Sequence, residues 1–569
     1  MRREAQAHNM TIHNMKITTF DIAGFEQWKE AAVLSLKGKP FDSLITKTIE
    51  GIDLQPLYTQ ESLVKRAQTI RVAKKEAGWI VAQQPYAESA EKFVAELKSS
   101  IERGNEAIVY DGTKQFRWEE SSLTEVARLM TRYPIFITNT QKNDSFLKIF
   151  SLVPETERST VSGAIAVMDW TIPEGYTFVR ATSADMWDAH HKGADAVTEL
   201  ALVLAFAANL ASKEDNFSDL ADDFFVRFAV DTHFFMEISK FRAFRILWQA
   251  FTSAYGVTAT PYVPIIATTS LRSYSKLDPY VNVLRAGNET FAAVLGGADV
   301  ITVHPHNIIT GPTNSSIRMA RNIQLVIKEE THTDKVIDPA GGSYFIETLT
   351  SELVDKAWAL FLEIESLGGY DVFSTSGRLE SLLDQRKSDV SKGKQSLIGT
   401  NVYAELTDTN FRDWDGIQFD GRLAKPFEKL AELQKDRATS IALLTFGELK
   451  DFKPRADFVN GFLATGGMRA EWSPAFDNAQ QALKWLADEN PDYAIVCATS
   501  SLTETVMEQL LAERAQHLIL DVAGKYDTAL SNKWLNAGLN GFIFAGQDKV
   551  EKLIAINDKL KGAVTHEQA

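Results

Sequence analysis

Cysteine is almost absent from this 569-residue chain, in which Cys497 is the only one. A single thiol cannot form an internal disulfide, and it excludes zinc and iron–sulfur sites built from several thiolates. The longest apolar run, residues 200–211, is also well short of the roughly 20 residues that a membrane helix needs. Residues 1–15 contain two arginines but no apolar core, so they do not resemble a secretory signal. We therefore expect a cytoplasmic protein.

Positive charge is in the minority. The chain has 60 lysines and arginines against 75 acidic residues, which gives a net charge of -15. Nucleic acids and anionic membranes attract basic surfaces, so this balance argues against either as a general partner. Hydrophobic residues make up 45% of the chain and charged residues 24%. These are ordinary values for a globular protein and exclude a mainly disordered one.

Short β-rich runs alternate with helical segments between residues 106 and 370. The expected strands are 107–110, 135–139, 163–168, 177–182, 224–230, 264–268, 299–303 and 335–337. Steady alternation of strand and helix implies a parallel sheet, and eight repeats suit a closed (β/α)8 barrel of the TIM type. An open doubly wound sheet is the alternative.

The segments on either side of this region have different patterns. Residues 1–105 are expected to form an N-terminal helical segment and arm. Residues 371–438 are polar and are interpreted as a connector, although a helical extension of the barrel fits them equally well. In residues 439–569 the alternation resumes over five shorter units, which is typical of a flavodoxin-like (Rossmann-like) α/β domain. Ligands of such sheets bind beyond the carboxyl ends of the strands.

Five motifs follow one another in an order that points to one family. They are DTHFFMEISKFR at 231–242, DPYVNVLR at 278–285, AVLGG at 293–297, RMARNIQL at 318–325 and DPAGGSYFIE at 338–347. This set resembles the methylmalonyl-CoA mutase family. The resemblance covers about residues 50–440 and implies an acyl-CoA mutase barrel followed by a cobalamin-binding domain. Members interconvert methylmalonyl-CoA and succinyl-CoA with a radical supplied by adenosylcobalamin.

The family's cobalt-binding loop has no counterpart in this sequence. In the family, the loop after the first strand of the cobalamin domain carries Asp-x-His-x-x-Gly, and its histidine ligates the cobalt. Residues 446–455 stand at that place and include no histidine. Ser501 and Leu502 are the candidates for residual cofactor contacts, because they lie in a stretch similar to the family's Ser-x-Leu. A helix N-cap explains that stretch equally well. We therefore expect no cofactor or metal ion bound by this chain.

The residues that hold the substrate carbonyl in catalytic members are also replaced. Trp187 and Asp188 stand where the family has tyrosine and histidine, and Asp299 and Thr302 stand where it has glutamine and histidine. An aspartate repels a developing carbonyl anion instead of donating a hydrogen bond to it. The resemblance therefore implies that this chain has no catalytic residues.

Histidines and arginines supply the remaining candidate ligands. His190 and His191 are neighbours in the chain, but adjacent side chains point apart and no third metal ligand is evident. His304 lies at an expected strand end, where barrel sites are found. Four arginines at 242, 245, 318 and 321 are possible phosphate contacts, and ion pairs or solvated helix faces are the preferred interpretation of each.

The resemblance and these replacements together suggest a supporting role. Some members of the family are heterodimers of two homologous chains, of which only one is catalytic. Our hypothesis is that this chain is the small, non-catalytic one, and that the large chain binds the adenosylcobalamin and the acyl-CoA substrate. The alternatives are a self-sufficient acyl-CoA mutase that binds cobalamin without a histidine, and a non-catalytic acyl-CoA-binding or regulatory protein.

Overall fold

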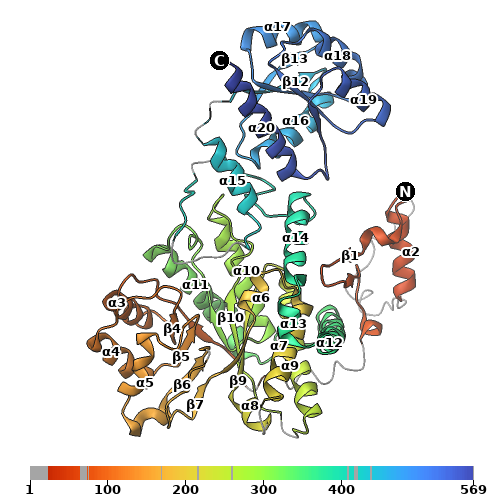
Figure 1. Cartoon of the computed structure of the whole chain (residues 1–569). Helices are drawn as coiled ribbons and strands as arrows, with labels where there is room; N and C mark the ends of the chain where they lie inside the picture. Colours follow the sequence, from red (N-terminus) through yellow and green to blue (C-terminus); the bar gives the residue numbers. More distant parts are fainter. Residues whose placement is uncertain are drawn as a thin grey trace, which may run out of the picture.

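The chain folds into a lower α/β body, an upper α/β body and an N-terminal arm (Figure 1). In the computed structural model the described residues are 24–63, 74, 76–167, 169–213, 217–257, 260–406, 409–414, 421–435, 437 and 439–567, with side chains described up to residue 561. The lower body contains the strands nearer the N-terminus, and the upper body is formed by the last part of the chain.

Two parallel sheets form the lower body. One has the order β4-β5-β6-β7 and the other the order β3-β11-β10-β9-β8. The strands are β3 (Ile80–Ala82), β4 (Ile108–Asp111), β5 (Ile135–Thr138), β6 (Ser162–Ile165), β7 (Phe178–Arg180), β8 (Thr182–Asp185), β9 (Phe224–Val230), β10 (Ile265–Thr269) and β11 (Val300–Thr302). Each pairing in them is parallel. The expected mixed α/β class with parallel sheets is therefore confirmed.

The two sheets approach each other at both of their edges. Only Ala181 separates β7 from β8. At the other edge, the Glu106 amide just before β4 donates a hydrogen bond to the Val81 carbonyl of β3, at 2.8 Å. Small and large apolar side chains from both sheets pack into one buried cluster. Its members are Ala82, Ala107, Val109, Phe136, Ala164, Phe225, Ile266 and Val300.

Helices cover the outer faces of these sheets. They are α3 (Ala90–Ile101), α4 (Glu120–Met130), α5 (Ile149–Leu152), α6 (Trp187–His191), α7 (Ala196–Ala211), α8 (Phe217–Asp223), α9 (Phe234–Ala254), α10 (Val281–Gly296), α11 (Asn314–Thr331), α12 (Tyr344–Ser366) and α13 (Tyr370–Ser374). Helix α7 packs against both α9 and α12, which explains its apolar run at 200–211. None of the described helices is both long and apolar enough to cross a membrane.

One expected strand is wrong, and an unexpected one takes its place in the sheet. Residues 335–337 were expected to form a strand, but Thr333–Lys335 make a 3-10 turn, and Val336 and Ile337 are about half exposed. A central strand would have buried both β-branched side chains. Instead β3, which lies in the segment expected to be helical, pairs with β11. The expected run at 177–182 is divided between β7 and β8.

The upper body contains one open parallel sheet with the order β13-β12-β14-β15-β16. Its strands are β12 (Ile441–Phe446), β13 (Glu471–Phe476), β14 (Tyr493–Cys497), β15 (Ile519–Ala523) and β16 (Gly541–Ile543). Its helices are α16 (Leu449–Ala464), α17 (Ala479–Glu489), α18 (Ser500–Glu513), α19 (Thr528–Asn536) and α20 (Lys549–Glu567). Cys497 ends β14 and is buried, and this burial raises the pKa of its thiol to about 12.

Helices α14 (Arg378–Ser391) and α15 (Lys425–Gln434) join the two bodies (Figure 1). The Arg386 guanidinium of α14 donates a hydrogen bond to the Gly193 carbonyl of the lower body, at 3.1 Å. Gln434 of α15 donates to Asn557 of α20 in the upper body, at 2.7 Å. The connector segment therefore contacts both bodies.

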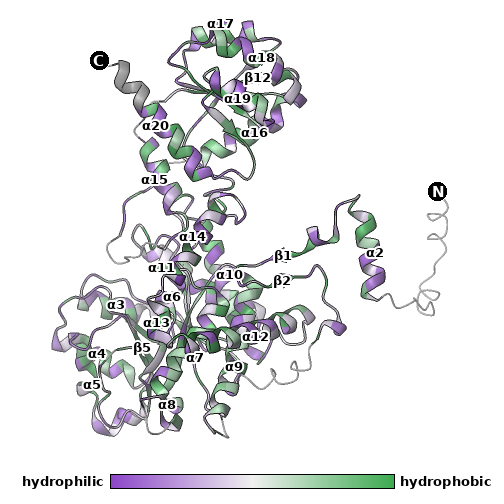
Figure 2. Cartoon of the chain, turned by 45° about the vertical axis from the view of Figure 1, so that its right-hand side comes forward, coloured by the Kyte–Doolittle hydropathy of each residue, from purple (hydrophilic) through white to green (hydrophobic). Residues whose placement is uncertain are grey.

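The N-terminal arm consists of α2 (Phe25–Ser35) and the hairpin β1 (Thr46–Lys47) and β2 (Asp53–Leu54). Figure 2 shows α2 standing apart from both bodies after the view is turned. No residue of α2 is buried, and Leu34 is 82% exposed. Residues 1–23, which belong to the segment expected to be helical, lie outside the described residues.

Candidate functional site

The carboxyl ends of β8, β9, β10 and β11 face the upper body and carry a dense set of polar residues. Helix α6 follows β8 directly, and the Asp185 carboxylate accepts a hydrogen bond from the Trp187 amide at its start, at 2.9 Å. Arg227 of β9 fixes this aspartate by an ion pair of 3.0 Å and stacks on the Trp187 ring. The end of β8 thereby sets the position of α6 and of its two histidines.

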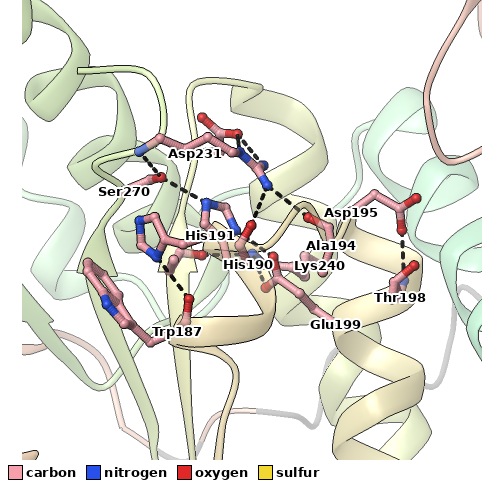
Figure 3. Close-up of polar contacts among 12 residues, drawn as sticks. Trp187, His190, His191, Ala194, Asp195, Thr198, Glu199, Asp231, Lys240 and Ser270 are labelled. Atoms are coloured by element: carbon pink, nitrogen blue, oxygen red, sulfur yellow. Dashed lines mark hydrogen bonds and ion pairs between the residues drawn. The ribbon is translucent and has the colours of Figure 1, made fainter. Parts of the chain in front are cut away.

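His190 lies fully buried at the centre of this set (Figure 3). Its Nδ1 lies 2.6 Å from the Glu199 carboxylate of α7, and its Nε2 lies 2.8 Å from the Ser270 hydroxyl after β10. Burial, together with the nearby Arg272 guanidinium, lowers the pKa of His190 well below its usual value. This imidazole is therefore neutral, and both of its nitrogens already have partners.

A buried lysine compensates the carboxylates beneath His190. Lys240 of α9 lies 2.9 Å from Glu199 and 2.7 Å from Glu237, and it donates to the Ala229 carbonyl at 2.8 Å. Burial raises the pKa of Glu237 to about 7, although the adjacent ammonium opposes this shift. The Lys240 pKa is itself raised, because the two carboxylates outweigh its burial. Both carboxylates are thus paired with this one lysine.

Arg272 and Asp231 form a second buried pair beside the first. The guanidinium Nε and Nη2 of Arg272 donate to one oxygen of Asp231, at 3.1 and 2.5 Å. Its Nη1 donates to the carbonyls of His190 and Ala194, at 2.8 and 2.9 Å. Burial alone would raise the pKa of Asp231, but the surrounding cationic groups, Arg272 foremost, together outweigh it and hold this pKa well below its usual range. The pair fixes the loop after α6 to the end of β9.

His191 makes hydrogen bonds to other groups than His190 does. Its Nδ1 donates to the Trp187 carbonyl at 2.8 Å, and its Nε2 accepts the Leu271 amide at 3.3 Å. The two imidazole rings are inclined at 77° to each other. Among the described residues, no group of three or more histidine, cysteine or acidic side chains is arranged to hold a metal ion.

Aromatic side chains lie across the strand ends above these pairs. The Trp187 ring meets the His304 ring at 5.6 Å, and His304 Nδ1 lies 3.0 Å from the Tyr86 hydroxyl. The Tyr86 ring in turn meets Trp414 of the connector segment, at 6.0 Å. Burial lowers the pKa of His304 to about 3, so this imidazole is neutral as well. We call Tyr86, Trp187, His304 and Trp414 the aromatic cover.

The structure separates the four positions that were expected to replace catalytic residues. Trp187 is half-buried in the aromatic cover, whereas Asp188 is exposed. Thr302 is the last residue of β11 and is buried. Asp299 precedes β11 at the opposite end of the sheet, where it accepts hydrogen bonds from Arg245 and the Ile265 amide, both at 2.7 Å. Asp299 is thus not brought together with the other three.

Several residues of this set were missed by sequence reasoning. Ser270, Lys240 and Tyr86 contact histidines or carboxylates that lie 41 to 218 positions away in the chain. A tertiary contact of this kind leaves no local pattern. The available signal was the set of charged residues at 231, 237 and 240, which lie within ten positions of one another.

The strand order of the upper sheet reverses between β12 and β14, and ligands of open α/β sheets bind at such a point. Arg455 of α16 reaches across this point. It donates to the Ser500 hydroxyl at 2.8 Å, the Ala523 carbonyl at 3.0 Å and the Tyr526 hydroxyl at 2.8 Å. One guanidinium thus ties α16 to the start of α18 and to the end of β15 with the turn after it.

Ser501 and Leu502 contribute to local packing at the start of α18. The helix is capped by Thr499, whose hydroxyl accepts a hydrogen bond from the Leu502 amide. Ser501 contacts the same hydroxyl at 3.3 Å. The Leu502 side chain packs so closely under Gly447 that a Cβ there would lie 2.8 Å from it. The loop after β12 is therefore pressed against α18.

Comparison with known proteins identifies relatives of this chain. The family described as methylmalonyl-CoA mutase matches residues 164–453. A methylmalonyl-CoA mutase small subunit of Porphyromonas gingivalis is 26% identical over 94% of this chain and 97% of its own length. One of Propionibacterium freudenreichii subsp. shermanii is 27% identical over 95% and 97%. A probable small subunit of Mycobacterium tuberculosis is 32% identical over 57% of this chain and 55% of its own length.

Proposed function

Because the chain belongs to the methylmalonyl-CoA mutase family, we propose that it is the small, non-catalytic subunit of a heterodimeric mutase. Its role is to pair with a homologous large subunit and stabilise it. The large subunit binds adenosylcobalamin and the acyl-CoA, and it carries the isomerisation of methylmalonyl-CoA and succinyl-CoA.

The proposed architecture is a closed (β/α)8 barrel followed by a flavodoxin-like domain of the cobalamin-binding type. The pairing of β11 with β3 and the continuity of β7 with β8 support closure of the barrel. In this arrangement β7 and β8 count as one strand. The barrel then begins before β3 and not at residue 106, and it ends near residue 370. Residues 371–438 are the connector, and residues 439–569 are the C-terminal domain.

The observation that carries the proposal is the connection between β12 and α16. A cobalamin domain of this family needs an imidazole there, and residues 447–448 between the two elements are glycine and glutamate. Arg455 and Leu502 fill the adjacent switch point of the sheet. His517 lies before β15, at the amino end of the strand, so it faces the opposite edge. The described residues therefore do not fit a histidine-ligated cobalamin.

The aromatic cover supports the same proposal for the lower body. A barrel enzyme keeps its substrate at the carboxyl ends of the strands. Here Trp187, His304 and Tyr86 lie in contact across those ends, and two buried ion pairs lie below them. The residue at the family's histidine position, Asp188, is exposed and forms no part of the buried pairs.

Partner binding is supported by the arm and by the relatives. Two of the proteins named small subunits match this chain over nearly their whole length. Within this chain, α2 buries none of its residues and leaves Leu34 exposed. A helix this poorly packed gains little from its own chain, so a second protein is its expected support.

The test is to mix the purified chain with adenosylcobalamin, pass it through gel filtration and record the visible spectrum. The measurement is made on the chain alone, on a large homologue alone and on the two together. We expect cobalamin absorbance and mutase activity only when the large chain is present, in a one-to-one complex.

Two other results would contradict the proposal. Stoichiometric cobalamin on the isolated chain would favour a self-sufficient mutase with another mode of cobalt binding. Separate elution of the two chains, with an acyl-CoA retained by this one, would favour an acyl-CoA-binding or regulatory protein.

A further inference from the structure

A cavity of about 660 Å³ lies between α3 and α11 on the outside of the lower body. We call it the arginine groove, because Arg103, Arg318 and Arg321 line it. Its other lining residues include Ser99 and Glu96 on α3 and Asn314 at the start of α11. The groove is separate from the aromatic cover and from the buried pairs, none of whose residues line it.

Arg321 lies at the floor of the groove and is only 5% exposed. Its Nε has no hydrogen-bond partner, and no ion pair found among the described residues includes it. The other two arginines that the sequence offered as phosphate contacts, in contrast, each form an ion pair. Arg242 is paired with Glu347 at 2.8 Å and Arg245 with Asp299 at 2.7 Å. A buried guanidinium nitrogen without an acceptor is costly to a folded protein, so it calls for an explanation.

Like charges surround Arg321. Arg103 and Arg318 stand exposed at the rim, and burial together with these two guanidiniums lowers the pKa of Arg321. Arg103 donates only to Ser99, and Arg318 forms no ion pair with the described residues. Glu96 is the one carboxylate in the lining, and it already accepts the Tyr86 amide at 3.1 Å. The lining therefore has three arginines against one carboxylate.

From this geometry we infer that the arginine groove binds a phosphorylated small molecule. A phosphate group would accept hydrogen bonds from Arg321 at the floor and from Arg103 and Arg318 at the rim, since guanidinium and phosphate match in charge and shape. The α11 N-terminus, at Asn314, adds a favourable dipole. Pro85, Ala95 and Ile317 in the lining offer an apolar surface for an organic part. The cavity has the size of an ordinary small-molecule site.

The experiment is calorimetric titration of the full chain at low ionic strength with inorganic pyrophosphate, ADP, an acyl-CoA and uncharged adenosine. We expect saturable one-to-one binding of the phosphorylated probes, weakening with added salt, and no binding of adenosine.

Arg321→Gln should lower the affinity about tenfold or more, because it removes a charge-assisted contact. If Arg321→Gln does not fold, Arg103→Gln at the exposed rim takes its place in the same test. Arg132→Gln, an exposed arginine outside the groove, is the control.

The comparison among probes identifies the source of the phosphate. Equal affinity for pyrophosphate and ADP would show that the groove binds only the phosphate groups. Tighter binding of ADP or of the acyl-CoA would show that it also contacts the organic part of the molecule. The inference is overturned if no phosphorylated probe binds, or if Arg321→Gln and Arg132→Gln bind alike. It is also overturned if Arg321→Gln weakens only the complex with a large homologue, which would make the groove a protein contact. The binding of the phosphorylated probes to the isolated chain does not depend on the proposed role in the mutase.

Discussion

His304 shows how burial sets the charge of a single residue in this protein. Its pKa is lowered to about 3 in the folded chain, against about 6.5 for an unfolded histidine. Between these values the unfolded state binds the proton and the folded state does not. The contribution of His304 to stability is therefore full above pH 6.5 and is lost as the pH falls toward 3. Buried carboxyls such as Glu237 act in the opposite direction, so the effect must be read from a difference between variants.

The pH dependence of stability should accordingly change when His304 is replaced. We expect the free energy of unfolding of His304→Gln to fall less steeply than that of the parent between pH 6 and 4, by about 1.4 kcal/mol per pH unit. Urea denaturation at several pH values measures this difference. His517→Gln is the control, because His517 is exposed. Parallel pH profiles for His304→Gln and the parent would show that His304 is protonated when folded.

Arg272 is a second residue whose removal should be costly. Arg272→Met leaves Asp231 buried and ionised without its partner, and loss of one member of such a pair costs about 3–5 kcal/mol of stability. The double variant Arg272→Met with Asp231→Asn should recover part of this loss. Chemical denaturation of both variants measures it. A single variant as stable as the parent would mean that Asp231 is neutral or solvated.

Helices and strands were predictable where the local pattern was strong. The expected strand 224–230 coincides with β9, because seven consecutive buried residues include β-branched and aromatic types. Strand β3 was missed because it has only three residues and its partner β11 lies 220 positions later in the chain. The β-branched residues Val336 and Ile337 were misleading, because two residues are too few to show the alternating pattern of a strand. Most polar contacts around His190 could not be predicted either, because the contacting residues lie far apart in the sequence.

Helix α14 depends on one glycine of the lower body. Gly193 has φ +120°, and a Cβ on it would lie 2.4 Å from the Leu379 carbonyl and 2.5 Å from the Leu383 amide of α14. Gly193→Ala should therefore destabilise the chain by about 1–3 kcal/mol, because the backbone of α14 must move away. In contrast, Gly461→Ala in α16 meets no atom within 4 Å and should be neutral or stabilising by up to about 1 kcal/mol. Thermal unfolding of both variants measures the contrast, and equal midpoints would refute it.

At the scale of the whole molecule, the arm and the two bodies differ in how firmly they are held. The bodies have buried cores, and α14 and α15 contact both. The arm has no buried residue in α2. If the proposed pairing with a large subunit is correct, the arm is a surface whose packing is completed only in the complex.

Leu34→Asp should weaken that complex without affecting the chain on its own. The leucine is 82% exposed, so its replacement removes little from the isolated fold, and a buried aspartate at an interface is unfavourable. We expect at least a tenfold loss of affinity for the large homologue, measured by biolayer interferometry. Leu535→Asp, on the partly exposed face of α19, is the matched control. Equal affinity of both variants would exclude α2 from the interface.

The burial of Cys497 has a practical consequence for spectroscopy. A thiol with a pKa of about 12 that is enclosed at the end of β14 is expected not to react with maleimide at neutral pH. Cysteines introduced at exposed positions therefore carry fluorophores or spin labels without a background signal and without prior removal of the native thiol. A label on the arm and another on the upper body would report, by energy transfer, how far the arm moves when the second chain binds.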